Sequence, residues 1–104
     1  MAGTSQWLYR IVPTRPEMPL DPTEEEMALG AAHFEYLVDL ERRGILIIAG
    51  RTQEAVGTFG IAIFEAPDAG AAQAITDADP AIAGGLFQVT LHRYQVAVAR
   101  SGLV

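Results

Sequence analysis

The segment between Asp21 and Gly44 most constrains the fold, because it carries the start and stop signals of one long helix. Asp21 followed by Pro22 fits an N-cap with proline at the first helical position, and Thr23 with Glu26 offers a capping box two residues later. Gly44 suits the position just past the last turn. Apolar residues recur at helical spacing in between, so we expect a helix from about residue 22 with one face toward a core.

Segments rich in β-branched and aromatic residues flank this helix. We expect strands over 6–12, 45–50, 58–66 and 86–99, the last with a bulge or bend near His92 and Arg93, and a second helix over 68–78 capped by Asp68. The order β-α-β-β-α-β predicts an α+β fold of the ferredoxin-like type. In this fold two helices cover one face of a four-stranded antiparallel sheet.

The later strands carry apolar side chains on both faces. In the segment 58–66, for example, Phe59, Ile61 and Ile63 alternate with Ala62 and Phe64. Helices can cover only one of these faces, and an apolar sheet face left in water is an association site. We therefore expect a homodimer in which a second copy packs on the open sheet face.

Composition excludes several classes of function. The 104 residues, half of them hydrophobic, predict a single domain over 1–104 with its core at about 6–99. The chain has no cysteine, and its net charge of −6 argues against nucleic acid as a partner. The longest apolar run, Ile45 to Ala49, is too short to span a membrane. The start of the chain shows no signal sequence, so we expect a cytoplasmic protein without membrane contact.

His33 falls inside the apolar arc of the expected helix, where an imidazole needs a hydrogen-bond partner. Asp79, just before Pro80, is the candidate partner. A histidine paired with a carboxylate can act as a general acid or base near neutral pH. Two other interpretations remain open: His33 could bond a backbone carbonyl in the core, and Asp79 could cap a short turn that has Pro80 at its first position.

Other polar residues give weaker signals. Arg51, at the end of the second strand, could clamp a carboxylate or phenolate, or could be a solvated strand-end arginine. Gly85 could let a ligand approach the backbone, or could serve a chain reversal. Four further side chains are assigned to the sheet face or the dimer seam: Trp7, Tyr9, His92 and Tyr94. No tight metal-ligand spacing occurs, so we expect no metal.

A spaced set of residues resembles the YCII-related family over about 7–98. The set comprises the helical His33, the Gly44 that ends the helix, Ala49-Gly50 at the close of the next strand, Asp79-Pro80, and Gly85 five residues after that proline. The resemblance implies a dimeric α+β barrel with an active site built around the histidine and the aspartate. It also implies proton transfer or elimination on a small molecule.

Two positions depart from the family pattern. Arg51 stands where the family often has proline, and Gly30 stands where it often has a basic residue. Both changes alter the charge expected at the pocket rim. Gly50 and Gly85 belong to the matching set, and Leu37 lies in the matching run that begins at His33. We assign these three residues, with Arg51, to substrate binding.

The leading hypothesis is a cofactor-free enzyme of the isomerase or lyase type, in which His33 and Asp79 are catalytic. Its substrate would be small and either cyclic or carbonyl-bearing. One alternative is a non-catalytic dimeric module that binds a small ligand or assists a larger enzyme. The other is a cofactor-free protein of the monooxygenase type.

Overall fold

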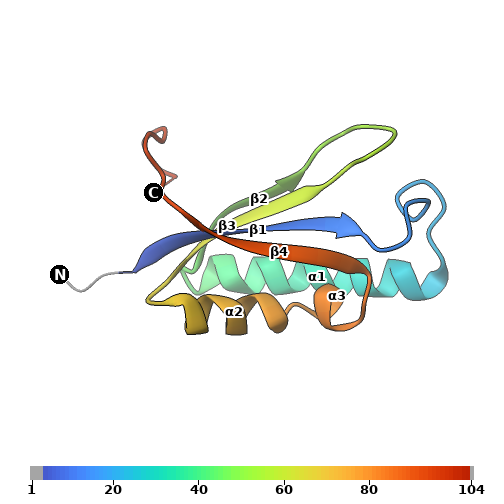
Figure 1. Cartoon of the computed structure of the whole chain (residues 1–104), viewed down its shortest axis with the longest axis horizontal. Helices are drawn as coiled ribbons and strands as arrows, with labels where there is room; N and C mark the ends of the chain where they lie inside the picture. The colour runs from blue at the N-terminus through green and yellow to red at the C-terminus, as the bar shows by residue number, and fades with distance from the viewer. Residues whose placement is uncertain (1–3, 104) are drawn as a thin grey trace.

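Four antiparallel strands form one sheet, and all the helices pack against the same face of it (Figure 1). The computed structural model describes residues 4–103. The strands are β1 (Ser5–Pro13), β2 (Leu46–Arg51), β3 (Gly60–Ala66) and β4 (Phe87–Tyr94), in the order β2-β3-β1-β4. The helices are α1 (Glu24–Arg42), α2 (Ala69–Asp77) and the short α3 (Pro80–Ala83). The predicted ferredoxin-like α+β fold is confirmed, with a third, four-residue helix added to the expected pair.

The capping box, and not Asp21, sets the start of α1. Thr23 is the N-cap: the Glu26 backbone N donates to its Oγ1 at 3.1 Å, and its own N donates to Glu26 Oε1 at 2.9 Å. The backbone N–H of Asp21 donates to Glu17 O at 2.9 Å, in a turn that precedes the helix. At the other end Gly44 has φ 74°, the left-handed conformation that favours glycine after a helix.

The last strand is shorter and more regular than predicted. β4 ends at Tyr94 and not at residue 99, because Tyr94 pairs with Gln6 near the start of β1 and little of that partner strand remains. Pairing from Phe87 to Tyr94 is continuous, so the predicted bulge near His92 is wrong. The irregularity lies in β2 instead, where the register shifts between Leu46 and Ile48.

The core lies between the sheet and the helices. Tyr9 of β1 and Phe64 of β3 are fully buried there, with ring centroids 5.8 Å apart. Burying side chains of this size contributes roughly 2 kcal/mol each. Trp7 is also on this face, and its indole N–H donates to Ala66 O at 3.3 Å.

The helix α1 contacts the core through a narrower stripe than its sequence predicts. Leu40 is fully buried, whereas Met27 and Phe34 are 55% and 67% exposed although the predicted apolar arc includes them. Both line a cavity that separates this part of α1 from the sheet, so they have no core to pack against. Within residues 4–103, none of the helices is long and apolar enough to cross a membrane.

In the part of the chain that the structure describes, no helix covers the opposite face of the sheet (Figure 1). Pairing places Ile63 of β3 opposite Ile48 of β2 and Leu8 of β1 on this face, and Ile48 is 46% exposed. Along β4 the same face carries polar side chains, among them Thr90 and His92. The open face thus has an apolar half and a polar half. The homodimer through this face remains a prediction.

Candidate active site

His33 and Asp79 are in direct contact. The helix α1 carries His33, and Asp79 precedes α3, which packs against α1. The imidazole Nδ1 lies 2.6 Å from Asp79 Oδ2. The pairing predicted from the apolar position of His33 is therefore present, although 46 positions separate the two residues along the chain.

The carboxylate of Asp79 is fully buried and completely partnered. Its Oδ1 accepts from the Ala81 backbone N at 2.9 Å, so Asp79 is the N-cap of α3 with Pro80 at the first position. Its Oδ2 accepts from the Tyr9 hydroxyl at 2.8 Å as well as facing His33. Asp79 is both the N-cap of α3 and the partner of His33, because one carboxylate oxygen binds the Ala81 N–H and the other faces the imidazole.

The sequence assigns Tyr9 to the sheet face or a dimer seam, but in the structure it belongs to this site. Its side chain is on the helix side of β1 and is fully buried. Burial above all, and then the negative charge of Asp79, raises the pKa of the Tyr9 hydroxyl far above its ordinary value. The hydroxyl therefore stays protonated as a hydrogen-bond donor. Its alternation with Trp7 and Ile11, both buried, is the signal that could have placed it inward.

One edge of the His33 ring remains accessible. The side chain is 15% exposed, and the ring packs edge-on against Phe87 with centroids 5.2 Å apart. Asp79 occupies Nδ1, so Nε2 is the nitrogen left for a ligand. In the neutral tautomer that places the proton on Nδ1, Nε2 offers a free lone pair, which is the arrangement a general base requires.

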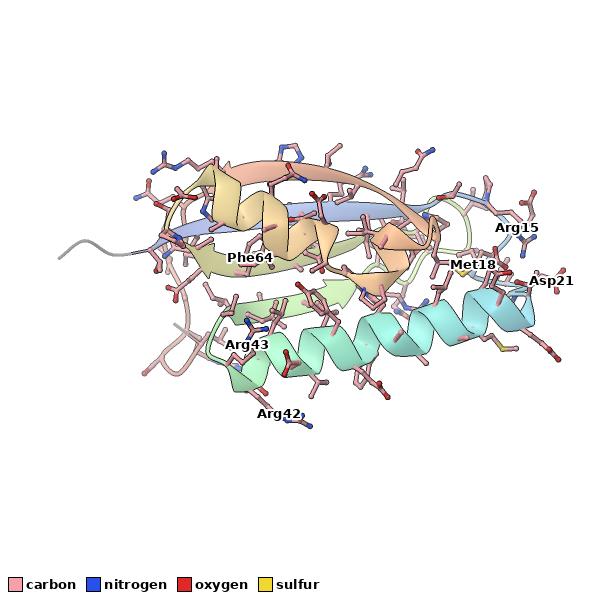
Figure 2. All side chains as sticks on the ribbon, turned by 90° about the horizontal axis from the view of Figure 1, so that it is seen from below. Arg15, Met18, Asp21, Arg42, Arg43 and Phe64 are labelled. Atoms are coloured by element: carbon pink, nitrogen blue, oxygen red, sulfur yellow. The ribbon has the colours of Figure 1, made fainter. Side chains whose placement is uncertain are left out.

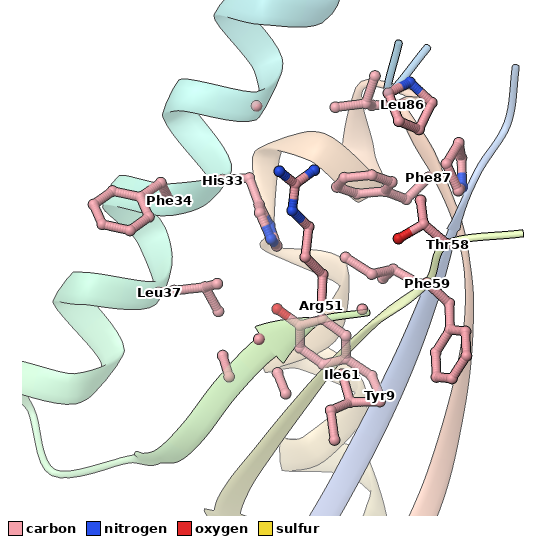
Figure 3. Close-up of a pocket in the computed structure, with 18 of the residues that line it drawn as sticks. Tyr9, His33, Phe34, Leu37, Arg51, Thr58, Phe59, Ile61, Leu86 and Phe87 are labelled. Carbon is pink, nitrogen blue, oxygen red and sulfur yellow. The ribbon is translucent and has the colours of Figure 1, made fainter. Parts of the chain in front are cut away.

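A cavity of about 670 Å³ lies between α1 and the helix-facing side of the sheet, and His33 is on its wall (Figure 3). Three residues assigned from sequence to substrate binding also line it: Leu37, Gly50 and Arg51. Gly85 is not among the lining residues. It has φ 80° just after α3, which fits the chain-reversal interpretation of this glycine.

The remaining candidates lie away from this cavity. His92 is exposed on the open face of the sheet, with its Nε2 2.9 Å from Thr90 Oγ1. Tyr94 is at the end of β4 and is 41% exposed. Among residues 4–103, no cluster of three or more histidine, aspartate or glutamate side chains is placed to hold a metal ion.

Comparison with known proteins identifies the family. The sequence pattern of the YCII-related domain matches residues 8–93. The chain belongs to the YCII-related domain family. The matched span of this YCII-related chain runs from β1 into β4 and includes His33, Asp79 and Arg51.

A solved structure supports the same fold. It is 5-chloro-2-hydroxyhydroquinone dehydrochlorinase (TftG) from Burkholderia phenoliruptrix AC1100, in complex with 2,5-dihydroxybenzoquinone. The two chains are 22% identical, with a TM-score of 0.64 over 86% of this chain and 93% of the other. No curated protein sequence matches the chain.

Proposed function

We propose that this YCII-related protein is a cofactor-independent enzyme of the lyase or isomerase type that transfers a proton on a small cyclic or carbonyl-bearing substrate. One observation carries the proposal. His33 Nδ1 is bound 2.6 Å from a fully buried carboxylate, while the same ring borders a cavity of about 670 Å³. A histidine held in this way has a defined orientation and one nitrogen free for chemistry.

In the proposed reaction His33 Nε2 takes a proton from an acidic C–H or O–H group of the substrate. Asp79 stabilises the resulting imidazolium through the Nδ1–H bond, and it remains a carboxylate. In a lyase the electron pair left on the substrate forms a double bond, and the leaving group departs with its own bonding pair. In an isomerase Nε2 returns the proton to a different atom. Positioned general acid-base catalysis of this kind contributes about 10²- to 10⁴-fold in rate.

The cavity wall favours a flat, largely apolar molecule. Leu37 and Phe87 line it, and Phe87 also packs against the His33 ring. TftG is named for the elimination of HCl from an oxygenated ring, and its structure holds a dihydroxyquinone. That protein supports a ring with oxygen substituents as the first substrate class to test.

The test measures proton exchange, because exchange can be detected without identifying the product. Cyclic 1,3-diketones and hydroxyquinones, including 2,5-dihydroxybenzoquinone, are incubated in D₂O with the protein, and loss of the ring C–H signal is followed by ¹H NMR. We expect wild type to accelerate exchange on at least one compound, and His33→Gln to slow it at least about 100-fold. His92→Gln is the matched control and should exchange at the wild-type rate.

Equal rates in wild type and His33→Gln would contradict the proposal. Binding of a compound without any exchange in wild type would favour the non-catalytic module instead. Oxygen uptake on electron-rich phenols without exchange would favour the monooxygenase-like alternative.

A further inference from the structure

The cavity exists because small residues face each other across it. On the sheet side the lining includes Ala49 of β2, paired with Ala62 of β3, and Gly60, and we call these three residues the floor. A Cβ at Gly60 would lie 3.1 Å from the Ile11 side chain and 3.3 Å from a backbone oxygen, so this position has no room for a larger residue. On the helix side Gly30 contributes no side chain, and a Cβ there would meet nothing within 4 Å.

Arg51 extends over this floor. It pairs with Gly60 in the register of β2 and β3, and its side chain lines the cavity (Figure 3). α1 and β2 run in opposite directions, joined by a tight turn (Figure 2). From Ile45 to Arg51 the strand extends about 20 Å from the turn. The same distance along α1, measured back from Gly44, corresponds to about 13 residues. Arg51 is therefore level with the part of α1 that holds Gly30 and His33.

The charges around the cavity leave Arg51 as the cation available to a ligand. Glu26 is at the rim, but both of its oxygens bind Arg15, at 2.7 and 3.0 Å. Glu41 lines the opposite end of the cavity, near the turn into β2. Arg51 itself forms no ion pair with any residue in the described range 4–103. A guanidinium with five donors, on the wall of the same cavity as His33, is suited to an oxygen that carries negative charge.

We infer that Arg51 is the specificity-determining residue of this cavity and that it selects substrates whose ring carries an ionised enol or phenol oxygen. The inference rests on the proposed function and names its substrate class. With that oxygen on Arg51, the adjacent ring carbon faces His33 Nε2. Removing a proton from the keto tautomer produces this ionised form: Nε2 takes the proton from the ring carbon, and the C–H bonding pair becomes the C=C bond of the enolate. The carbonyl π pair moves to the oxygen bound by Arg51, where a preorganised cation stabilises the charge.

Binding of two quinones tests this class without any turnover. The probes are 2,5-dihydroxybenzoquinone, whose hydroxyls ionise in neutral water, and the uncharged 2,5-dimethoxybenzoquinone. Calorimetric titration of His33→Gln, which has no base to react, should show the dihydroxy compound binding at least about 10-fold more tightly than the dimethoxy compound. Adding Arg51→Gln should weaken only the dihydroxy compound, by about 10- to 100-fold.

A second variant places a positive charge on the helix side of the cavity, opposite Arg51. Gly30 has open space above it, so Gly30→Lys can place an ammonium in the cavity from the helix side. In the Arg51→Gln background this change should restore at least part of the lost affinity for the dihydroxy compound. Melting temperatures near wild type would show that each variant is folded.

Three outcomes would overturn the inference: equal binding of the two probes, an unchanged affinity in Arg51→Gln, or no binding of the dihydroxy compound at all. The proposed function fails separately, if His33→Gln exchanges protons as fast as wild type. A substrate without an ionised oxygen could still be processed by His33, so the two failures are distinguishable.

Discussion

One histidine lies on each side of the sheet, His33 on α1 and His92 on β4, and the two differ in what surrounds them. On the helix side, His33 is 15% exposed and contacts a fully buried carboxylate that Tyr9 and the backbone of Ala81 also hold. On the open side, His92 is exposed and has a threonine hydroxyl as its neighbour. The same side chain is oriented by a fixed acceptor in one place and by an exposed hydroxyl in the other.

The buried acceptor, more than the histidine, therefore defines the candidate site. Asp79 is held by three donors from three different parts of the chain, so its position is determined by the fold as a whole. Thr90 lies two residues from His92 on the same strand, so their contact is local. We therefore expect changes around Asp79 to affect stability and chemistry together, and changes around Thr90 to affect neither.

The largest effect should come from Asp79→Asn. The amide cannot accept from Tyr9 and His33 while its oxygen accepts from Ala81, so at least one buried donor loses its partner. We expect a loss of at least about 2 kcal/mol in the free energy of unfolding, measured by urea denaturation, and loss of the proton exchange proposed above. Thr90→Val on the open face should change the free energy by less than about 0.5 kcal/mol. A wild-type stability in Asp79→Asn would contradict this account.

The second prediction concerns assembly through the open face. Ile48→Arg places a charge in the apolar half of that face, where we predict the second copy to pack. Sedimentation should show a dimer for wild type and a dissociation constant raised at least about 10-fold for the variant, because burying an unpaired charge is costly. Gln53→Arg, in the exposed loop after β2, is the control and should remain dimeric. A monomeric wild type would refute the predicted dimer.

The third prediction compares two tyrosines. Tyr9→Phe removes a donor from a buried carboxylate and should cost about 1.5–3 kcal/mol, whereas Tyr94→Phe at the exposed end of β4 should cost almost nothing. Both losses are measured by urea denaturation. Equal stabilities of the two variants would contradict the role assigned to Tyr9.

The same tyrosine predicts an alkaline pH dependence. The folded pKa of Tyr9 is raised above the unfolded value near 10, so its contribution to stability is complete below about pH 10 and falls as the pH rises further. The slope of unfolding free energy between pH 10 and 11 should be smaller in Tyr9→Phe than in wild type. An unchanged slope would mean that Tyr9 ionises in the folded protein.

The smallest effect should come from the rim of the helix-side cavity. Hydrogen bonds from Arg15 first, and then from the Thr23 backbone, lower the pKa of Glu26 from 4.5 to about 2. Its contribution to stability is therefore complete above about pH 4.5 and is lost as the pH falls toward 2. The melting temperature of Glu26→Gln should depend less steeply on pH over this range than that of wild type. A parallel decline in both proteins would contradict the assignment.

Local signals in the sequence predicted the parts of the molecule that local chemistry controls. Three such signals appear in the structure as expected: the glycine that ends α1 (Gly44), the Asp79-Pro80 cap of α3, and the alternation along β3. Each depends only on residues close to it in the sequence. His33 was placed correctly because a polar group on an apolar face requires a buried partner.

Features that depend on distant partners were missed. The inward position of Tyr9 depends on which face of β1 meets the helices, and the shorter β4 depends on where β1 begins. Met27 and Phe34 are exposed because small residues on two strands open a cavity beneath α1. None of these follows from the periodicity of a single segment.

The tautomer of His33 decides whether Asp79 orients this histidine as a base. Long-range ¹H–¹⁵N NMR of histidine-labelled protein reports which ring nitrogen carries the proton in the neutral form, with His92 as the internal reference. We predict that the proton of His33 is on Nδ1 in wild type, that Nε2 is bare, and that this preference is lost in Asp79→Asn while the His92 signals stay unchanged. A proton on Nε2 in wild type, or a His33 tautomer unaffected by Asp79→Asn, would contradict the account.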